Sequence, residues 1–167
     1  MSRPTFDPTS SSSPPGGSEL GAGLPSPTSI LIVDDNLQNL ELMQAYLEEL
    51  DCPVRTARDG MEALQAVEQE APDLILLDVM MPRMSGFQVC SKLKAAPATR
   101  EIPVIMVTAL NELGDVEKAK ESGADDFVTK PVNKVELVIR VKSLLQLRLL
   151  RRKLETTMEQ MRKLKGE

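Results

Sequence analysis

Between residues 28 and 148, short apolar segments alternate with longer segments in which apolar residues recur every three or four positions. Three of the short segments are continuously apolar and rich in β-branched residues, which is typical of strands buried inside a sheet. The predicted strands cover residues 29–35, 53–57, 73–78, 102–109 and 125–129. The longer segments have the spacing of amphipathic helices. The predicted helices cover residues 36–50, 59–70, 87–96, 111–123 and 133 almost to the end of the chain.

Strand and helix alternate five times with short connections, so the fold class is α/β. Asn36 and Asp59 are placed to cap two of the helices, and Gly123 is a natural residue for the end of a third. Because the central strands are apolar on both faces, we expect a parallel sheet covered by helices on both sides. Such sheets bind ligands at the carboxyl ends of their strands.

Polar side chains follow four of the predicted strands. They are Asp34, Asp35, Asp78, Thr108 and Lys130. Taken singly, each has an ordinary alternative: the aspartates at the end of the first strand could cap a helix, and the lysine could lie on the surface. Taken together, they stand where the carboxyl ends of parallel strands meet, so the set favours a functional crevice.

Three carboxylates in one crevice repel one another, and Lys130 supplies only one positive charge. A hard divalent cation fits the remainder, because Mg²⁺ prefers oxygen ligands. The expected ligands are Asp34 or Asp35, Asp78 and the backbone carbonyl of Met80. This set contains neither histidine nor thiolate, which favours Mg²⁺ over zinc.

A carboxylate beside a magnesium ion, a lysine and a hydroxyl group is equipped for phosphoryl transfer. Asp78 would be the nucleophile and would form an acyl phosphate. Lys130 would neutralise charge on the transferred group, and Thr108 would donate a hydrogen bond to it.

The segments "LIVDDN", "LILLDVMMPRMSG", "MVTA" and "GADDFVTKP" resemble the receiver domains of two-component response regulators. The resemblance covers about residues 28–148. It includes the spacings, since Asp78 lies 30 residues before Thr108 and 52 before Lys130. It implies the doubly wound (βα)5 flavodoxin-like fold with strand order 2-1-3-4-5. It also implies a cis peptide before Pro131.

The resemblance implies that a histidine kinase phosphorylates Asp78 in the presence of Mg²⁺. Thr108 then moves inward, Phe127 rotates, and the face formed by the fourth helix, fifth strand and fifth helix changes its binding of a downstream protein. Such a chain is not an enzyme that turns over a separate substrate. The alternative is a detached input receiver of a larger protein, such as a diguanylate cyclase or a hybrid histidine kinase.

The composition and the motifs disfavour several other classes of protein. The net charge is −5, and no helix-turn-helix pattern follows the receiver, so we expect no direct DNA binding.

Two isolated cysteines, Cys52 and Cys90, suit a cytoplasmic protein with reduced thiols. No segment resembles a signal peptide or a membrane span. A magnesium phosphohydrolase of another family is disfavoured, because Met80 stands where such an enzyme needs a second aspartate.

The two ends of the chain differ from the predicted domain. In residues 1–27, Ser, Pro and Gly make up 17 of 27 residues, which predicts a disordered tail. Residues 149–167 extend the last helix. An apolar series with alternating steps of three and four runs through Leu147, Leu150, Leu154, Thr157, Met161 and Leu164.

Three interpretations of this extension stay open. It could form a phosphorylation-linked coiled-coil homodimer, be a solvated helix or a piece of a longer protein, or dock as a basic helix on an acidic partner. The third interpretation rests on seven basic and three acidic residues from Arg148 to Glu167. A homodimer could also use the face of the fourth helix, fifth strand and fifth helix.

Overall fold

The computed structural model describes residues 28–109 and 113–166. The predicted tail over residues 1–27 lies outside these ranges. The strands are β1 Ile30–Val33, β2 Val54–Ala57, β3 Leu74–Asp78, β4 Val104–Thr108 and β5 Asp126–Thr129. The helices are α1 Leu37–Leu47, α2 Gly60–Gln69, α3 Gly86–Ala95, α4 Leu113–Glu121 and α5 Lys134–Leu164, with a short 3-10 helix, η1, at Glu48–Leu50. Every strand and helix expected from the sequence is present.

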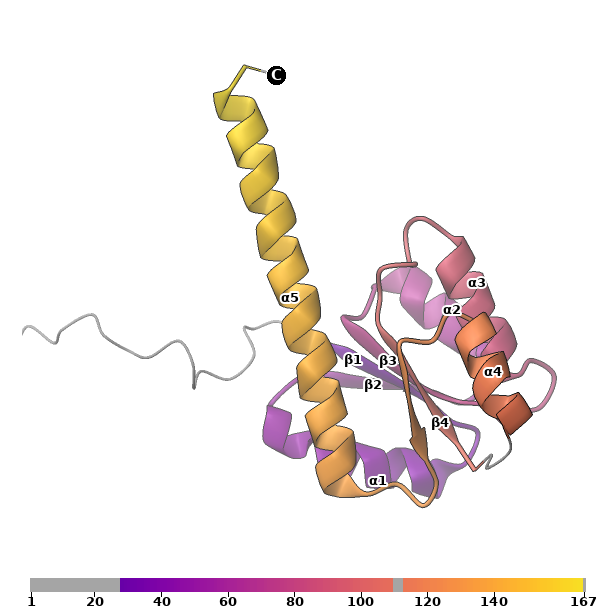
Figure 1. Ribbon diagram of the computed structural model, residues 1–167. Coiled ribbons are helices and arrows are strands. Elements are labelled where there is room, and N and C mark those ends of the chain that lie inside the picture. Colours follow the sequence, from indigo (N-terminus) through magenta and orange to yellow (C-terminus); the bar gives the residue numbers. More distant parts are fainter. Residues whose placement is uncertain (1–27, 110–112, 167) are drawn as a thin grey trace, which may run out of the picture.

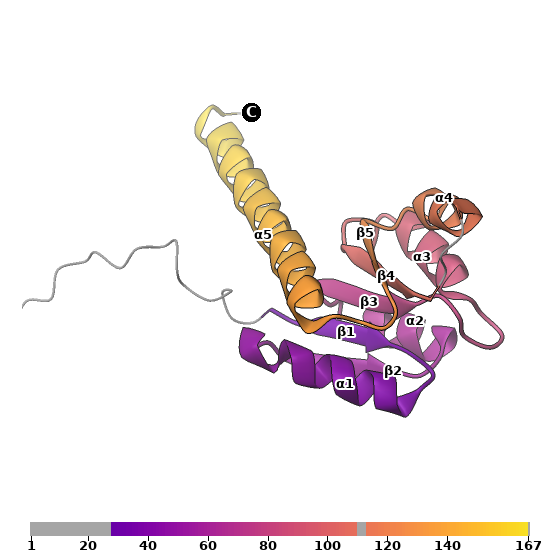
Figure 2. The ribbon, with the colours of Figure 1, turned by 60° about the horizontal axis from the view of Figure 1, so that its bottom comes forward.

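The five strands form one parallel sheet in the order β2-β1-β3-β4-β5. This confirms the implied fold and strand order. Helices α1 and α5 cover one face, and α2, α3 and α4 lie on the other (Figures 1 and 2). The chain moves from β1 outward to β2 and then back to β3, so the strand order reverses between β1 and β3. The carboxyl ends of these two strands are therefore neighbours at the place where such sheets bind ligands.

The continuous apolar strands are explained by two separate cores. Along β1, Ile30 and Ile32 pack with α1 and α5, whereas Leu31 and Val33 pack with α2 and α3. All four side chains are fully buried. A strand covered on both faces cannot alternate apolar with polar residues, and this is the pattern that the sequence shows.

Side-chain caps fix where the helices begin. Asn36 accepts a hydrogen bond from a backbone N–H of α1, and Asp59 does so for α2, as predicted. Ser85 and Gln88 form a reciprocal capping box at the start of α3. The prediction that the first helix continues to residue 50 is wrong in its last turn, where η1 tightens the backbone before Asp51 takes a positive φ of 51°.

Helix α5 is the longest element, with 31 residues. Its first part is anchored in the core by Leu137, Val138, Val141 and Leu145. Its later turns stand clear of the sheet and the other helices (Figure 1). Among the described helices, none combines the length and the apolarity that crossing a bilayer requires.

Candidate functional site

The site lies at the carboxyl edge of the sheet, where β1 and β3 end side by side. Asp34 and Asp35 follow β1, and Asp78 is the last residue of β3. One carboxylate oxygen from each of the three lies within 4.8 Å of the others. Asp34 and Asp78 are buried, with 0% and 2% of their surfaces exposed, whereas Asp35 is exposed. The structure therefore gathers the three predicted carboxylates into one cluster.

Neither Asp34 nor Asp35 is the N-cap of α1, because that position is held by Asn36. Oδ1 of Asp34 accepts a hydrogen bond from the backbone N–H of Asn36 at 2.9 Å. The second oxygen, Oδ2, is buried and makes no hydrogen bond to any described residue. A buried carboxylate oxygen without a hydrogen bond is costly, and a nearby cation is the usual compensation.

Lys130 reaches this cluster from the loop after β5. Its Nζ lies 3.2 Å from Oδ1 of Asp78 and 3.5 Å from Oδ2 of Asp34. The lysine backbone is fixed as well, because its N–H donates to the carbonyl of Thr108 at 2.7 Å. The Lys130–Pro131 peptide bond is cis, as the resemblance implied. One lysine thus faces two buried carboxylates.

The shortage of positive charge beside the two buried carboxylates affects the pKa of Asp78. Burial raises the pKa of its carboxyl group, and the neighbouring charge of Asp34 raises it further. Lys130 and a hydrogen bond from the backbone N–H of Met80 act in the opposite direction without cancelling the rise. The single lysine therefore does not fully compensate the ionised form of Asp78.

Thr108 and Phe127 lie on neighbouring strands. Met106 pairs with Phe127, and Thr108 pairs with Thr129, so Thr108 and Phe127 project from the same face of the sheet, two residue pairs apart. This is the face covered by α2 and α3, because Met106 belongs to that core. Thr108 is buried, whereas Phe127 is 36% exposed. The structure places the two predicted switch residues on the same face of adjacent strands, and their switching remains a prediction.

The loop between β3 and α3 contains a position that the sequence reasoning missed. A Cβ atom on Gly86 would lie 2.3 Å from the carbonyl oxygen of Asp78 and 2.9 Å from Cα of Val79. The backbone N–H of Gly86 donates to the carbonyl of Val79 at 2.9 Å. Only glycine permits this close approach, which closes the loop that carries Met80. The available signal was a glycine at the start of a predicted helix.

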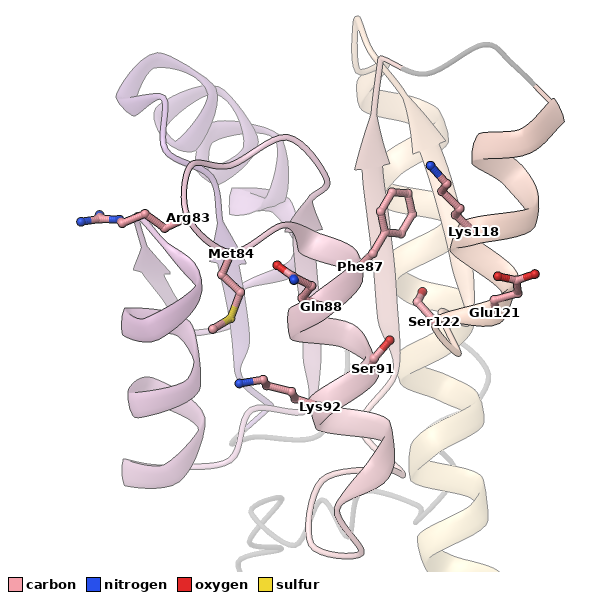
Figure 3. Close-up of a pocket in the computed structure, with 9 residues that line it drawn as sticks. All are labelled: Arg83, Met84, Phe87, Gln88, Ser91, Lys92, Lys118, Glu121 and Ser122. Carbon is pink, nitrogen blue, oxygen red and sulfur yellow. The ribbon is translucent and has the colours of Figure 1, made fainter.

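A separate groove of about 640 Å³ lies between α3 and α4 (Figure 3). It contains none of the predicted site residues. Its lining mixes basic, acidic and apolar side chains from the loop after β3 and from the two helices. These residues are Arg83, Met84, Phe87, Gln88, Ser91, Lys92, Lys118, Glu121 and Ser122. The groove is therefore distinct from the acidic cluster at the carboxyl edge of the sheet.

Comparison with known proteins agrees with this geometry. The family model described as "Response regulator receiver domain" matches residues 30–142. The response regulator PleD of Caulobacter vibrioides is 51% identical over 120 residues, which are 72% of this chain and 26% of PleD. The DNA-binding dual master transcriptional regulator RpaA of Synechocystis is 41% identical over 117 residues, covering 70% of this chain and 48% of RpaA.

Solved structures give the same result. The receiver domain of a signal transduction histidine kinase from Syntrophus aciditrophicus superposes with a TM-score of 0.68 at 43% identity, covering 71% of this chain and 90% of that one. A receiver domain protein from Methanospirillum hungatei reaches a TM-score of 0.70 at 30% identity, covering 75% and 99%.

The chain spans about half or less of the length of the relatives PleD and RpaA, and the shared part is the receiver. Receiver domains interact with histidine kinases. The fold, the strand order and the acidic cluster beside Lys130 agree with the family match. The chain belongs to the response regulator receiver domain family, which acts in two-component phosphorelay signalling.

Proposed function

We propose that Asp78 is the phosphoacceptor of this receiver. The observation that carries the proposal is the position of its carboxylate, buried at the end of β3 with Oδ1 3.2 Å from Nζ of Lys130. A carboxylate oxygen of Asp78 attacks the phosphorus of the donor, and the bond from phosphorus to the leaving group breaks. The donor is the phosphohistidine of a partner histidine kinase or a small molecule such as acetyl phosphate. Because the given sequence contains no histidine, a protein donor acts in trans.

Lys130 and Thr108 assist this transfer. Lys130 is held by its backbone at the edge of the site and places positive charge where the phosphoryl oxygens gather. Thr108, the last residue of β4, donates its hydroxyl hydrogen to one of these oxygens. The chain thereby promotes its own phosphorylation without turning over a separate substrate.

The residues present fit a magnesium ion. The donor set is entirely oxygen, and three carboxylates with one lysine leave an excess of negative charge. Oδ2 of Asp34 is buried, accepts no hydrogen bond from any described residue and lies 3.5 Å from Nζ of Lys130, a lysine that it shares with Asp78, so a second cation would be most favourable there. The holding residues would be Asp34 or Asp35, Asp78 and the backbone carbonyl of Met80. Bound Mg²⁺ would supply charge neutralisation for the transferred phosphoryl group.

Phosphorylation changes the face formed by α4, β5 and α5. Thr108 is drawn toward the phosphoryl group, and Phe127, now partly exposed on the same face of the adjacent strand, rotates into the vacated space. Moving such a switch from 1:99 to 99:1 requires about 5.5 kcal/mol of differential stabilisation. Charge-assisted hydrogen bonds to the phosphoryl oxygens supply energies of this order. A downstream protein then reads the altered face.

The alternative is that this receiver is the input part of a larger signalling protein. Its support is that PleD and RpaA extend well beyond the matched part, and that one similar structure is the receiver of a histidine kinase. Under this alternative the receiver controls a different downstream output, and Asp78 is still the phosphoacceptor. The absence of direct DNA binding stays a prediction, because several relatives are named as transcriptional regulators.

The phosphoacceptor is tested by incubating the chain with acetyl phosphate and Mg²⁺ and measuring intact mass. The wild type should gain one phosphoryl group, and Asp78→Asn should gain none. The matched control is Asp51→Asn, because Asp51 is an exposed aspartate and asparagine tolerates its positive φ. Equal labelling of Asp78→Asn and the wild type would refute the assignment. Circular dichroism would confirm that both variants are folded.

A further inference from the structure

The later turns of α5 carry an unusual amount of exposed apolar surface. Of the thirteen large apolar side chains that are exposed among the described residues, six lie between residues 147 and 164. Leu150 is 65% exposed, Leu154 60% and Leu164 88%. Scattered apolar residues are normal on a surface, whereas a contiguous series marks an interaction site.

The exposed residues follow the spacing of a coiled-coil seam. Steps of three and four connect Leu147, Leu150, Leu154, Thr157, Met161 and Leu164, which occupy alternating a and d positions. Because the first turns of α5 are packed in the core, the helix is already nucleated when it leaves the domain. The extension therefore does not bear the nucleation cost of an isolated short helix.

A cluster of charges fixes the direction in which this seam faces. Asp73, directly before β3, accepts a hydrogen bond from Arg152 at 2.9 Å and lies 3.6 Å from Nε of Arg148. Arg148 also donates to the carbonyl of Glu101 at 2.7 Å. The two arginines are one helical turn apart, so they hold one side of α5 against the amino edge of the sheet. Leu147, the first seam residue, still borders a groove with Glu101 and Pro103 of the receiver. From Leu150 onward, the seam lies on the side of the helix opposite the two arginines and faces away from the receiver.

Thr157 is the one polar residue in the seam, and its hydroxyl is already satisfied. Its Oγ1 donates to the carbonyl of Lys153 in the preceding turn at 2.8 Å. Covering Thr157 with a partner helix therefore leaves no unpaired hydrogen-bond donor. Thr157 therefore makes this part of the seam less apolar without preventing its burial.

The charges beside the seam are compatible with a second copy of this chain. In a parallel, in-register pair, each g position faces the e position five residues further along the partner helix. The facing pairs are Gln146 with Arg151, Lys153 with Met158, and Gln160 with Lys165. Each pair contains one basic and one uncharged residue, so none of these facing pairs joins two like charges.

We propose that residues 147–164 of α5 form a parallel, two-stranded coiled coil with a second copy of this chain. The seam residues supply the buried surface, and the contacts of Asp73 with Arg148 and Arg152 keep that surface turned outward. The receiver lies on the opposite side of its own helix, so two receivers are accommodated beside one seam. This assembly needs no phosphorylation, and it is independent of the phosphoacceptor assignment.

The test compares two adjacent threonines by sedimentation equilibrium of the full chain over a range of concentrations. Thr156 and Thr157 are both exposed, and both donate their hydroxyls to a carbonyl one turn earlier. They lie about 100° apart around the helix axis, and only Thr157 is in the seam. The wild type and Thr156→Glu should be dimers. Thr157→Glu should raise the dimer dissociation constant by about 100-fold or more, because it buries two unpaired carboxylates per dimer.

Orientation is tested with cysteine at the same two positions. In a parallel, in-register pair Thr157 faces its own counterpart, so Thr157→Cys should form an intermolecular disulfide readily and Thr156→Cys should not. A wild-type chain that stays monomeric would overturn the proposal and leave the seam to a helix of another protein or to solvent. Equal effects of the two glutamate substitutions would also overturn it. A dimer without cross-linking through Thr157→Cys would refute the parallel arrangement.

Discussion

Replacing Lys130 by methionine tests the charge balance of the site directly. Methionine keeps much of the aliphatic length and removes the cation that, among the described residues, faces both Asp34 and Asp78. At an effective dielectric constant near 20, a unit charge pair separated by 3.2 Å or 3.5 Å attracts by about 5 kcal/mol before desolvation is counted. Removing one partner of a buried ion pair costs about 3–5 kcal/mol in measured cases. Because the Lys130 side chain is 26% exposed, we expect the lower end, about 3 kcal/mol of unfolding free energy.

The loss should depend on pH in a defined direction. The pKa of Asp78 is already raised in the folded state, and removing Lys130 raises it further. An acid with a raised folded-state pKa destabilises the fold when it is ionised, at pH values above that pKa. The cost vanishes below the pKa of the unfolded chain, about 3.9 for aspartate. The destabilisation by Lys130→Met should therefore be largest at neutral pH and shrink as the pH falls.

The assay is urea unfolding at several pH values, with a chelator present and then with Mg²⁺. The control is Lys142→Met, because Lys142 is an exposed lysine of α5 far from the carboxylates in sequence. Magnesium should stabilise Lys130→Met more than the wild type, since a cation that binds only the folded state stabilises it by mass action. A loss below about 1 kcal/mol, or one equal to that of Lys142→Met at every pH, would refute the charge argument.

Two further substitutions address the elements around the site. Gly86→Ala should lower the unfolding free energy by more than about 2 kcal/mol in urea, because the new Cβ would meet the carbonyl of Asp78 at 2.3 Å; an unchanged midpoint would contradict this. Asp73→Asn should weaken the contacts of Arg148 and Arg152 and speed amide hydrogen exchange in the turn that contains them; exchange equal to the wild type would show that these arginines do not hold the helix.

The fold could be predicted because its signals are local. Continuous apolar strands occur only where both faces of a sheet are covered, and Asn36 and Asp59 mark helix starts through hydrogen bonds within one turn. The last turn of α1 was missed, because the sequence pattern stays helical through Leu50 while the backbone tightens into η1. Such changes at helix ends depend on packing that periodicity does not encode.

The membership of the site could also be predicted, because parallel strands bring their carboxyl ends to one edge. The relative burial of its members could not. Asp34 and Asp35 are adjacent in sequence, yet Asp34 is fully buried and Asp35 is exposed. The difference arises because the chain turns toward α1 directly after β1, where the N–H of Asn36 binds Asp34. Gly86 was missed because its role is a close approach between two backbone segments.

Two aspartates at opposite ends of β3 differ in the charges that surround them. Both are buried, with Asp73 8% and Asp78 2% exposed. Asp73 is met by a backbone N–H from Ser29 at 2.8 Å and by two arginines that lie more than 70 residues further along the chain. Asp78 shares one lysine with a second buried carboxylate. Asp73 thus has an excess of donors and holds α5 in place. Around Asp78, by contrast, negative charge exceeds positive charge. Binding of a metal ion and attachment of a phosphoryl group would together change this balance.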